Sequence, residues 1–173
     1  MKIALSGTPG VGKSKVAKKL EENGYQVLYL EDIADKFVIG YDEERKSKIV
    51  DEEAMDEYIK KIKEEDMLII EGHLSHLLSV DAVILLRCHP KELEKRLAAK
   101  NWDEKKIKEN LEAEALDVIL DRALEKHEMV WEIDTTGKSI EEVVKEVRKI
   151  LEETPPSSYG KIDWSSWLME NVR

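Results

Sequence analysis

Short runs of apolar residues recur along the chain, and each is typical of a strand that is buried on both faces. Continuous runs of this kind belong to parallel sheets that helices cover on both sides. The predicted strands are Ile3–Leu5, Gln26–Glu31, Met67–Ile70, Asp81–Arg87 and Val130–Asp134.

Between the strands, apolar residues return every three or four positions, as on the buried face of an amphipathic helix. The alternation of strand and helix predicts an α/β fold with a parallel sheet. We expect residues 32–50 to form a polar, irregular insertion, and Asp51, Asn101 and Ser139 to be N-caps. The predicted helices are Lys13–Glu22, Glu52–Lys63, Pro90–Lys100, Asn101 through Val118, and Ser139 through Leu151.

A glycine-rich segment, Gly7–Ser14, joins the first strand to the first helix. It fits the phosphate-binding loop pattern Gly-x4-Gly-Lys-Ser/Thr in the strand–turn–helix context that this pattern requires. Glycine permits backbone conformations in which amide groups point inward and form a nest for phosphate oxygens. The glycines of the segment are Gly7, Gly10 and Gly12.

The last two residues of this loop carry the expected chemistry. Lys13 should reach the β- and γ-phosphates of a nucleoside triphosphate, and the Ser14 hydroxyl should bind Mg²⁺. The alternative is a glycine turn that only links strand to helix. We favour the phosphate site because loop, lysine and serine are all correctly placed at the start of the chain.

The third predicted strand ends in Glu71-Gly72-His73. An acid at the end of a strand in a phosphate-loop protein is where the ligand of the metal and its water usually sits. His73 either orients an attacking water or is a structural histidine, and the spacing favours neither. No cluster with His76 supports a transition-metal site. We expect His89 and His127 on the surface.

Cations gather after the fourth predicted strand, at Arg87, Arg96, Lys100 and Arg122. They are either solvated charges and helix pairs, or part of a mobile lid that places cations on a transferred phosphoryl group. The turn at residues 136–138 follows the fifth strand at the sheet edge where α/β folds bind ligands, so it could hold the adenine base.

Residues 154–158, Thr-Pro-Pro-Ser-Ser, should end the last helix and begin a tail that carries Trp164 and Trp167. The tail either folds back on the domain or is a docking segment. We favour folding back, because a free aromatic tail is an aggregation liability.

The composition narrows the possible functions. At 173 residues, one domain is expected. The net charge of −10 argues against binding along duplex phosphates but permits a basic protein partner. The lone Cys88 excludes an internal disulfide and suggests a reducing, cytoplasmic location. Met1-Lys2 leads straight into the first strand, so no signal peptide is expected, and no apolar run is long enough to span a membrane.

The phosphate loop alone leaves several classes open. The Asn-Lys-x-Asp motif by which GTPases recognise guanine is absent from the sequence. An insertion after the second strand and a cation-bearing helical segment after the fourth suit a small kinase instead.

The chain resembles the adenylate kinase isoenzyme 6 type of nucleoside monophosphate kinases and ATPases, archaeal branch, over nearly all of residues 1–152. The most specific evidence for this resemblance is the stretch Gly40–Glu44 and the Glu71-x-His73 pair. The other stretches that carry it are Gly7–Ser14, Asp32-Ile33-Ala34, Ile49–Glu52, Leu85-Leu86-Arg87, Arg96-Leu97 and Trp102-x-Glu104-Lys105-Lys106-Ile107-x-x-Asn110.

This resemblance implies a phosphate-loop kinase domain over residues 1–153, with a five-stranded sheet ordered 2-3-1-4-5. It implies a monophosphate-binding insertion over about 29–53, a lid over about 99–109, and a separate tail over 154–173. The implied activity is broad-specificity, reversible transfer of the ATP γ-phosphoryl group to AMP or another monophosphate, together with ATP hydrolysis, both with Mg²⁺.

The resemblance also implies roles for individual residues. The catalytic residues would be Lys13, Glu71, His73 and Arg96, with Ser14 and Glu71 at the metal. The monophosphate would meet Asp32, Tyr41 and Asp42. The ATP-binding residues would be Gly7, Gly10, Gly12, Lys13, Ser14, Lys15, Lys100 and Lys138.

A role in late maturation of the small ribosomal subunit and its 16S rRNA is implied as well. There the chain would bind a basic platform ribosomal protein on the pre-ribosome and release it on hydrolysis, without sequence-specific nucleic-acid binding of its own. The alternatives are an assembly ATPase with little kinase activity, and a non-catalytic nucleotide-sensing protein.

Two positions depart from the family pattern. The acid near the metal is often Asp, and here it is Glu71. The lid position that is often Arg is here Lys100, which cannot make a two-pronged contact with phosphate. Kinase turnover could therefore be weak, leaving hydrolysis as the main activity.

Overall fold

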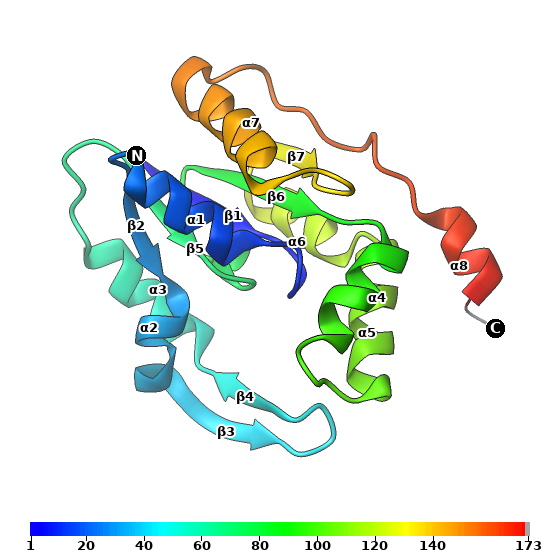
Figure 1. The fold of residues 1–173 in the computed structure, drawn as a ribbon. Coiled ribbons are helices and arrows are strands. Elements are labelled where there is room, and N and C mark those ends of the chain that lie inside the picture. Colours follow the sequence, from blue (N-terminus) through cyan, green and yellow to red (C-terminus); the bar gives the residue numbers. More distant parts are fainter. Residues whose placement is uncertain (172–173) are drawn as a thin grey trace.

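A five-stranded parallel sheet, in the order β2-β5-β1-β6-β7, forms the centre of the molecule (Figure 1). The structure is a computed structural model and describes residues 1–171. The predicted α/β class and the sheet order 2-3-1-4-5 are confirmed. The sheet strands are β1 (Lys2–Ser6), β2 (Gln26–Tyr29), β5 (Leu68–Glu71), β6 (Ala82–Arg87) and β7 (Val130–Asp134).

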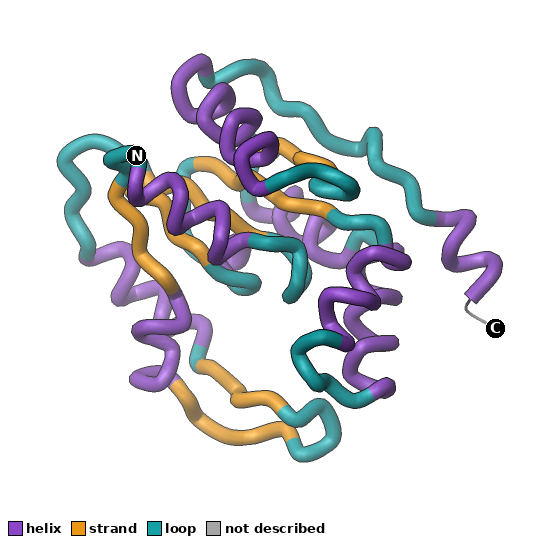
Figure 2. The backbone as a smooth tube through the Cα atoms, in the orientation of Figure 1, coloured by secondary structure: helices purple, strands orange, loops and turns teal. Residues whose placement is uncertain are grey.

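Helices cover both faces of this sheet, as the continuous apolar strands require (Figure 2). Neighbouring residues of a strand point to opposite faces. Ile3 and Leu5 therefore pack in one core with α1 and α7, whereas Ala4 packs in another with α6. The helices are α1 (Lys13–Glu22), α2 (Leu30–Ala34), α3 (Glu52–Lys61), α4 (Pro90–Ala98), α5 (Glu104–Ala115), α6 (Val118–Lys126), α7 (Ile140–Glu153) and α8 (Ser165–Asn171), with short 3-10 turns at Asp35–Phe37 and Ser75–Leu77.

The insertion after the second strand is ordered, so the expectation of irregular structure over residues 32–50 was wrong. β2 ends at Tyr29, and α2 begins at Leu30 instead of the strand continuing to Glu31. β3 (Val38–Asp42) and β4 (Ser47–Val50) then form an antiparallel hairpin. Most of its side chains are exposed on both faces, so the sequence shows no alternation of apolar and polar residues that would reveal strands.

The helical segment after α4 also differs from expectation. Asp103, not Asn101, caps α5, because its carboxylate accepts the Lys106 N–H at 2.8 Å. The predicted single helix through Val118 is interrupted at Asp117, which has a left-handed backbone with φ 57°. The Asp117 carboxylate accepts from Arg87 at 2.6 Å, so a tertiary contact holds this break where local sequence favours a helix.

The tail folds back along the free edge of β7. Ser158 bridges Trp131, with the Glu132 N–H donating to the Ser158 carbonyl at 2.9 Å. The Trp131 Nε1–H donates to the carbonyl oxygens of Pro155 and Pro156 at 3.2 and 3.1 Å. The prediction that the tail folds back on the domain is therefore confirmed for residues 155–158. This part of the tail covers a sheet edge that would otherwise be open to pairing.

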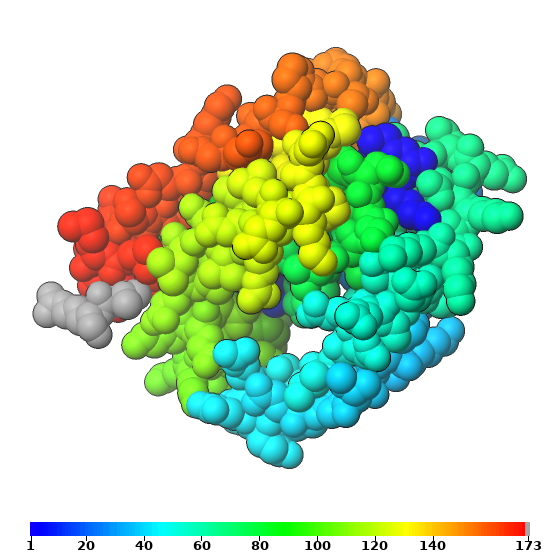
Figure 3. Space-filling model, turned by 180° about the vertical axis from the view of Figure 1, so that it is seen from behind, coloured from blue at the N-terminus to red at the C-terminus, as the bar shows by residue number. Residues whose placement is uncertain are grey.

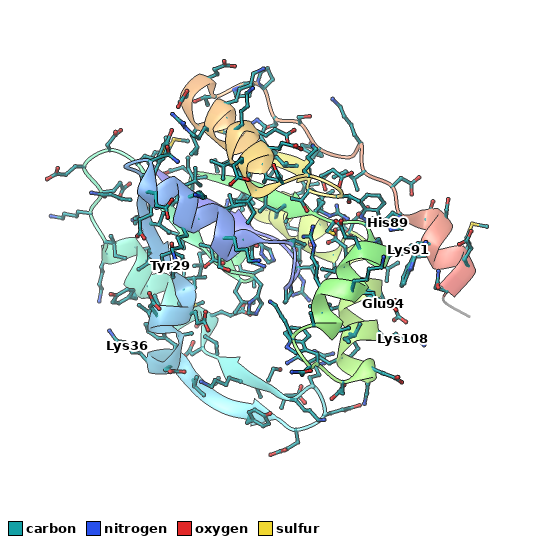
Figure 4. The ribbon with its side chains drawn as sticks, in the orientation of Figure 1. Tyr29, Lys36, His89, Lys91, Glu94 and Lys108 are labelled. Atoms are coloured by element: carbon teal, nitrogen blue, oxygen red, sulfur yellow. The ribbon has the colours of Figure 1, made fainter. Side chains whose placement is uncertain are left out.

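The ring of Trp164 in the tail meets His89 edge-on, with centroids 4.9 Å apart. His89 lies at the start of α4 (Figure 4), where its Nδ1 accepts the Lys91 N–H at 3.1 Å and caps the helix. It is half-buried, so the expectation of a plain surface histidine was wrong. Within residues 1–171 no helix combines the length and apolar character needed to cross a membrane.

We predict that Trp131→Phe loosens the tail without unfolding the sheet. The substitution keeps an aromatic ring but removes the N–H that holds residues 155 and 156, a loss worth about 1 kcal/mol. Limited trypsin digestion should then cut at Lys161 about fivefold faster. Tyr159→Phe is the control, since Tyr159 is exposed. Equal cleavage rates in the wild type and Trp131→Phe would contradict the anchoring role.

Candidate active site

The phosphate loop lies between β1 and α1, at the carboxyl edge of the sheet. Gly7 has φ 150°, and a Cβ there would lie 2.5 Å from the Leu86 carbonyl oxygen, so only glycine fits. Gly12, with φ 103°, begins α1 in a left-handed conformation. The loop is thus pressed against β6, and the amino end of α1 faces the space above it.

Lys13 is the buried cation of the loop, with 8% of its surface exposed. Its Nζ donates to the carbonyl oxygens of Gly7 at 2.7 Å and Thr8 at 3.1 Å. Burial lowers the pKa of Lys13 to about 8, with Lys100 acting in the same direction and Glu71 opposing it. Glu71, predicted to be catalytic, and Lys100, predicted to bind ATP, therefore both lie within electrostatic reach of Lys13.

Glu71 ends β5, beside Leu5 of β1 and Tyr29 of β2. It is 7% exposed, and burial raises its pKa, an effect that Lys13 opposes and Glu31 and Asp32 reinforce. A divalent cation would favour the ionised carboxylate, so the residue suits a metal. Ser14 presents its exposed side chain from the first turn of α1.

Mg²⁺ is the metal that this donor set fits. Residues 1–171 contain no group of three or more His, Cys, Asp and Glu side chains that would form an all-protein cage. Mg²⁺ keeps several waters and needs only one or two protein oxygens besides substrate phosphates. Ser14 and Glu71 are the residues that would supply such oxygens.

His73 follows Glu71 by two residues and has an exposed side chain. Although part of the ring is open to solvent, protein atoms crowd around it and, with the ammonium groups of Lys13 and Lys106, lower its pKa to about 4. The ring is therefore neutral at pH 7 and has a nitrogen that can accept a hydrogen bond. Both alternatives for His73, the orientation of a water and a structural role, therefore stay open to experiment.

Two other histidines form a buried pair beneath the loop. His76 Nδ1 and the Ser6 hydroxyl lie 2.8 Å apart, and the His127 Nε2–H donates to the His76 carbonyl at 2.9 Å. His127 is buried, so its expected surface position was wrong. Packing between α6 and the turn after β5 buries it, which its polar sequence neighbours do not indicate.

The four cations considered for a lid separate into distinct environments. Arg87 is 1% exposed and bonded to Glu114, Asp117 and Glu132, so it is not available to a phosphate.

Arg96 reaches back from α4 to the loop. Its guanidinium donates to the carbonyl oxygens of Gly10 at 3.3 Å and Val11 at 3.2 Å, and pairs with Glu92 at 2.8 Å. Lys100 and Arg122 are exposed. The structure therefore places Arg96 against the phosphate loop and leaves Lys100 open to solvent near Lys13.

The remaining predicted ligand residues lie around the same edge. Lys15 is exposed on α1. Lys138 pairs with Glu146 at 3.0 Å, and the neighbouring Gly137 N–H approaches the Glu92 carboxylate at 3.3 Å, which ties this turn to α4.

Asp32 is exposed on α2 and acts electrostatically on Glu71. Tyr41 is 51% exposed on β3. Asp42 accepts the N–H groups of Glu44 and Arg45, both at 3.0 Å, so in this structure it shapes the hairpin turn.

The hairpin tip touches the start of α5 across the front of the loop. Lys46 pairs with Asp103 at 2.7 Å, and Lys105 pairs with Glu44 at 3.0 Å. Figure 3 shows an opening bounded by the hairpin in cyan and the α5 region in green. The phosphate loop therefore faces a cleft that has the insertion on one side and the lid segment on the other.

Comparison with known proteins agrees with this geometry. A family model described as "AAA domain" matches residues 3–117. An Archaeoglobus fulgidus protein named "Putative adenylate kinase" is 47% identical over 176 residues, which cover 99% of this chain and 96% of its own length. Proteins of the same name from Pyrococcus furiosus and Thermococcus onnurineus are each 43% identical, over 99% and 95% of this chain and 96% and 92% of their own lengths.

The chain belongs to the family of these archaeal putative adenylate kinases, within the AAA-domain family. The segment that the family model matches contains the phosphate loop, Glu71, His73 and all of α5. The α/β fold and the phosphate loop therefore agree with both comparisons.

One contact of the site was missed from the sequence. Glu114 accepts the Thr8 hydroxyl of the loop at 2.9 Å. Glu114 follows Ile107 and Leu111 on the buried face of α5. An acid on an apolar face was the available signal, but the many other acids of this helix hid it.

We predict that kcat/KM for Mg·ATP falls above pH about 8, because Lys13 loses its proton there in the free enzyme. The alkaline limb of kcat should lie at higher pH, since bound phosphates favour the ammonium. Lys13→Arg is the control: its guanidinium stays charged, so any residual activity should lack this limb. The same limb in both proteins would exclude Lys13 as the titrating group.

Proposed function

We propose that the protein is a nucleoside monophosphate kinase of the adenylate kinase type, which transfers the ATP γ-phosphoryl group to AMP or a related monophosphate. The buried ammonium of Lys13 carries the proposal. It is held by two neutral carbonyl oxygens next to Glu71, in a loop that faces a cleft. Relatives named "Putative adenylate kinase", which align with this chain over nearly their whole lengths, support the proposal.

In this proposal the loop amides and Lys13 bind the β- and γ-phosphates, and Lys15, Lys100 and Lys138 add cations around the triphosphate. Arg96, which donates to two carbonyl groups of the loop, would contact the transferred group. Mg²⁺, held by Ser14 and Glu71, would neutralise charge on the phosphates. The insertion would bind the monophosphate through Asp32, Tyr41 and Asp42.

The same site would hydrolyse ATP when water replaces the monophosphate. A neutral His73 at the mouth of the loop can accept a hydrogen bond from a water and orient it. Lys100, as a point charge, would stabilise the kinase transition state less than an arginine fork. A nucleotide-dependent ATPase with little kinase activity is therefore the second candidate.

We predict that ATP turnover rises strongly with AMP, and that Lys13→Ala abolishes it. His73→Ala should lower hydrolysis about 10²-fold and leave Mg·ATP affinity nearly unchanged. Initial rates with AMP, CMP, GMP, UMP or no acceptor, and calorimetric titration with Mg·ATP, measure both effects.

Lys91→Ala is the surface control, near the start of α4 (Figure 4). Turnover that is independent of every monophosphate would favour the ATPase. Binding without turnover would leave a nucleotide-sensing protein. Equal loss of rate and affinity in His73→Ala would assign it a structural role.

We further propose that the nucleotide cycle acts in maturation of the small ribosomal subunit and its 16S rRNA, through a basic platform ribosomal protein on the pre-ribosome. The family resemblance and the net charge of −10 support this, since opposite charges steer such encounters.

We predict that a purified basic platform protein of the small subunit binds the chain at low salt and is released during ATP hydrolysis. With Lys13→Ala the complex should persist after ATP is added, because the triphosphate is not turned over. Size-exclusion chromatography at low and high salt measures both steps. Failure to bind at low salt, or equal release from the variant, would argue against this role.

A further inference from the structure

Glu114 is a fully buried carboxylate that the proposed chemistry does not use. It lies in the last turn of α5 and is 3% exposed. One oxygen accepts the Thr8 hydroxyl at 2.9 Å. The other accepts the Arg87 Nε–H at 2.8 Å and the Cys88 N–H at 3.0 Å. A single side chain thus joins the phosphate loop to the end of β6.

Arg87 fixes the place of this carboxylate. Its other guanidinium nitrogens bond to Glu132, to Asp117 and to the main-chain carbonyl of Glu114. Burial alone would lower the pKa of Arg87, but these carboxylates outweigh it and raise the pKa above its ordinary value. The cation is permanently charged and contacts both the carboxylate and the main-chain carbonyl of Glu114. These two contacts keep Glu114 from following small movements of the loop.

Thr8 links Glu114 to the ammonium group of Lys13. Its hydroxyl is held by Glu114, and its carbonyl oxygen accepts from Lys13 Nζ at 3.1 Å. Thr8 is 2% exposed, so water cannot replace the carboxylate as its partner. Two hydrogen bonds therefore connect α5 with the group that should neutralise the phosphates.

The opposite end of α5 borders the cleft. Lys105, in its first turn, pairs with Glu44 of the hairpin at 3.0 Å. α5 is one continuous helix with a rise of about 1.5 Å per residue. It therefore connects the mouth of the cleft rigidly with the loop beneath it. Because Glu114 belongs to α5, the position of this helix sets where the Thr8 hydroxyl is held.

We propose that Glu114 is a positioning residue, which fixes Thr8 and through it Lys13 and makes the geometry of the phosphate loop depend on the position of α5. The inference rests on the proposed function of the loop as a phosphoryl-transfer site. It adds a group that touches neither substrate nor metal but sets where the ammonium lies.

Thr8→Val tests the inference most directly, because it replaces the hydroxyl with a methyl group of similar size and leaves the Glu114–Arg87 pair intact. We expect kcat to fall about tenfold and the dissociation constant of Mg·ATP to rise about tenfold, with KM for AMP unchanged. Thr8→Ser keeps the hydroxyl and should restore both values. Glu114→Gln also weakens the contact with Arg87. It should likewise lower kcat and Mg·ATP affinity without changing KM for AMP, and should lose more thermal stability.

Glu109→Gln is the matched control, an exposed acid on the same helix. Thermal unfolding is measured for every variant. Unchanged kcat and Mg·ATP affinity in Thr8→Val would overturn the inference. So would a uniform loss that Thr8→Ser fails to rescue. If the wild type binds Mg·ATP without turning over, the proposed function fails, yet the dissociation constants of the Thr8 variants still decide the role of Glu114.

Discussion

The ammonium of Lys13 held by the loop's own carbonyl groups is the contact on which the site depends. Gly7 and Thr8 can offer these carbonyls only because the chain turns sharply after β1, with Gly7 packed directly on Leu86 of β6. Burial makes the charge costly and lowers the pKa of Lys13. A bound triphosphate would offset that penalty, so the burial of Lys13 increases the preference of the loop for phosphate.

The order of the sheet brings the other groups to this lysine. β1 lies between β5 and β6, so the loop after β1 has Glu71 on one side and Arg87-Cys88 on the other. Parallel pairing places all these carboxyl ends at one edge. The α4–α5 segment follows β6 and the hairpin follows β2, so the two flanks of the cleft come from strands on opposite sides of β1.

Much of this could be predicted from the sequence where the signal was local. The apolar strands, the loop pattern and Glu71 all follow from residues adjacent in the chain. The hairpin could not be predicted, because Tyr41 and Ile49 are exposed and leave no alternation. The break at Asp117 and the burial of His127 depend on partners far away in sequence, Arg87 and His76. The Thr8–Glu114 contact spans more than a hundred residues, and no spacing rule covers such a distance.

Lys13 and Arg87, both buried cations, show how the partners of a charge determine its role. Arg87 meets three carboxylates, so its charge is fully balanced within the protein and it serves to hold β6, β7 and α5 together. Lys13 meets two neutral carbonyls at hydrogen-bond distance, and the carboxylates of Glu71 and Glu114 act on it only from farther away. Its charge therefore remains available to an anion from outside. Glu114 contributes to both environments, since it balances Arg87 directly and orients Lys13 through Thr8. A stable charged cluster thus serves as the fixed support for a cation whose charge has no close partner in the described part of the chain.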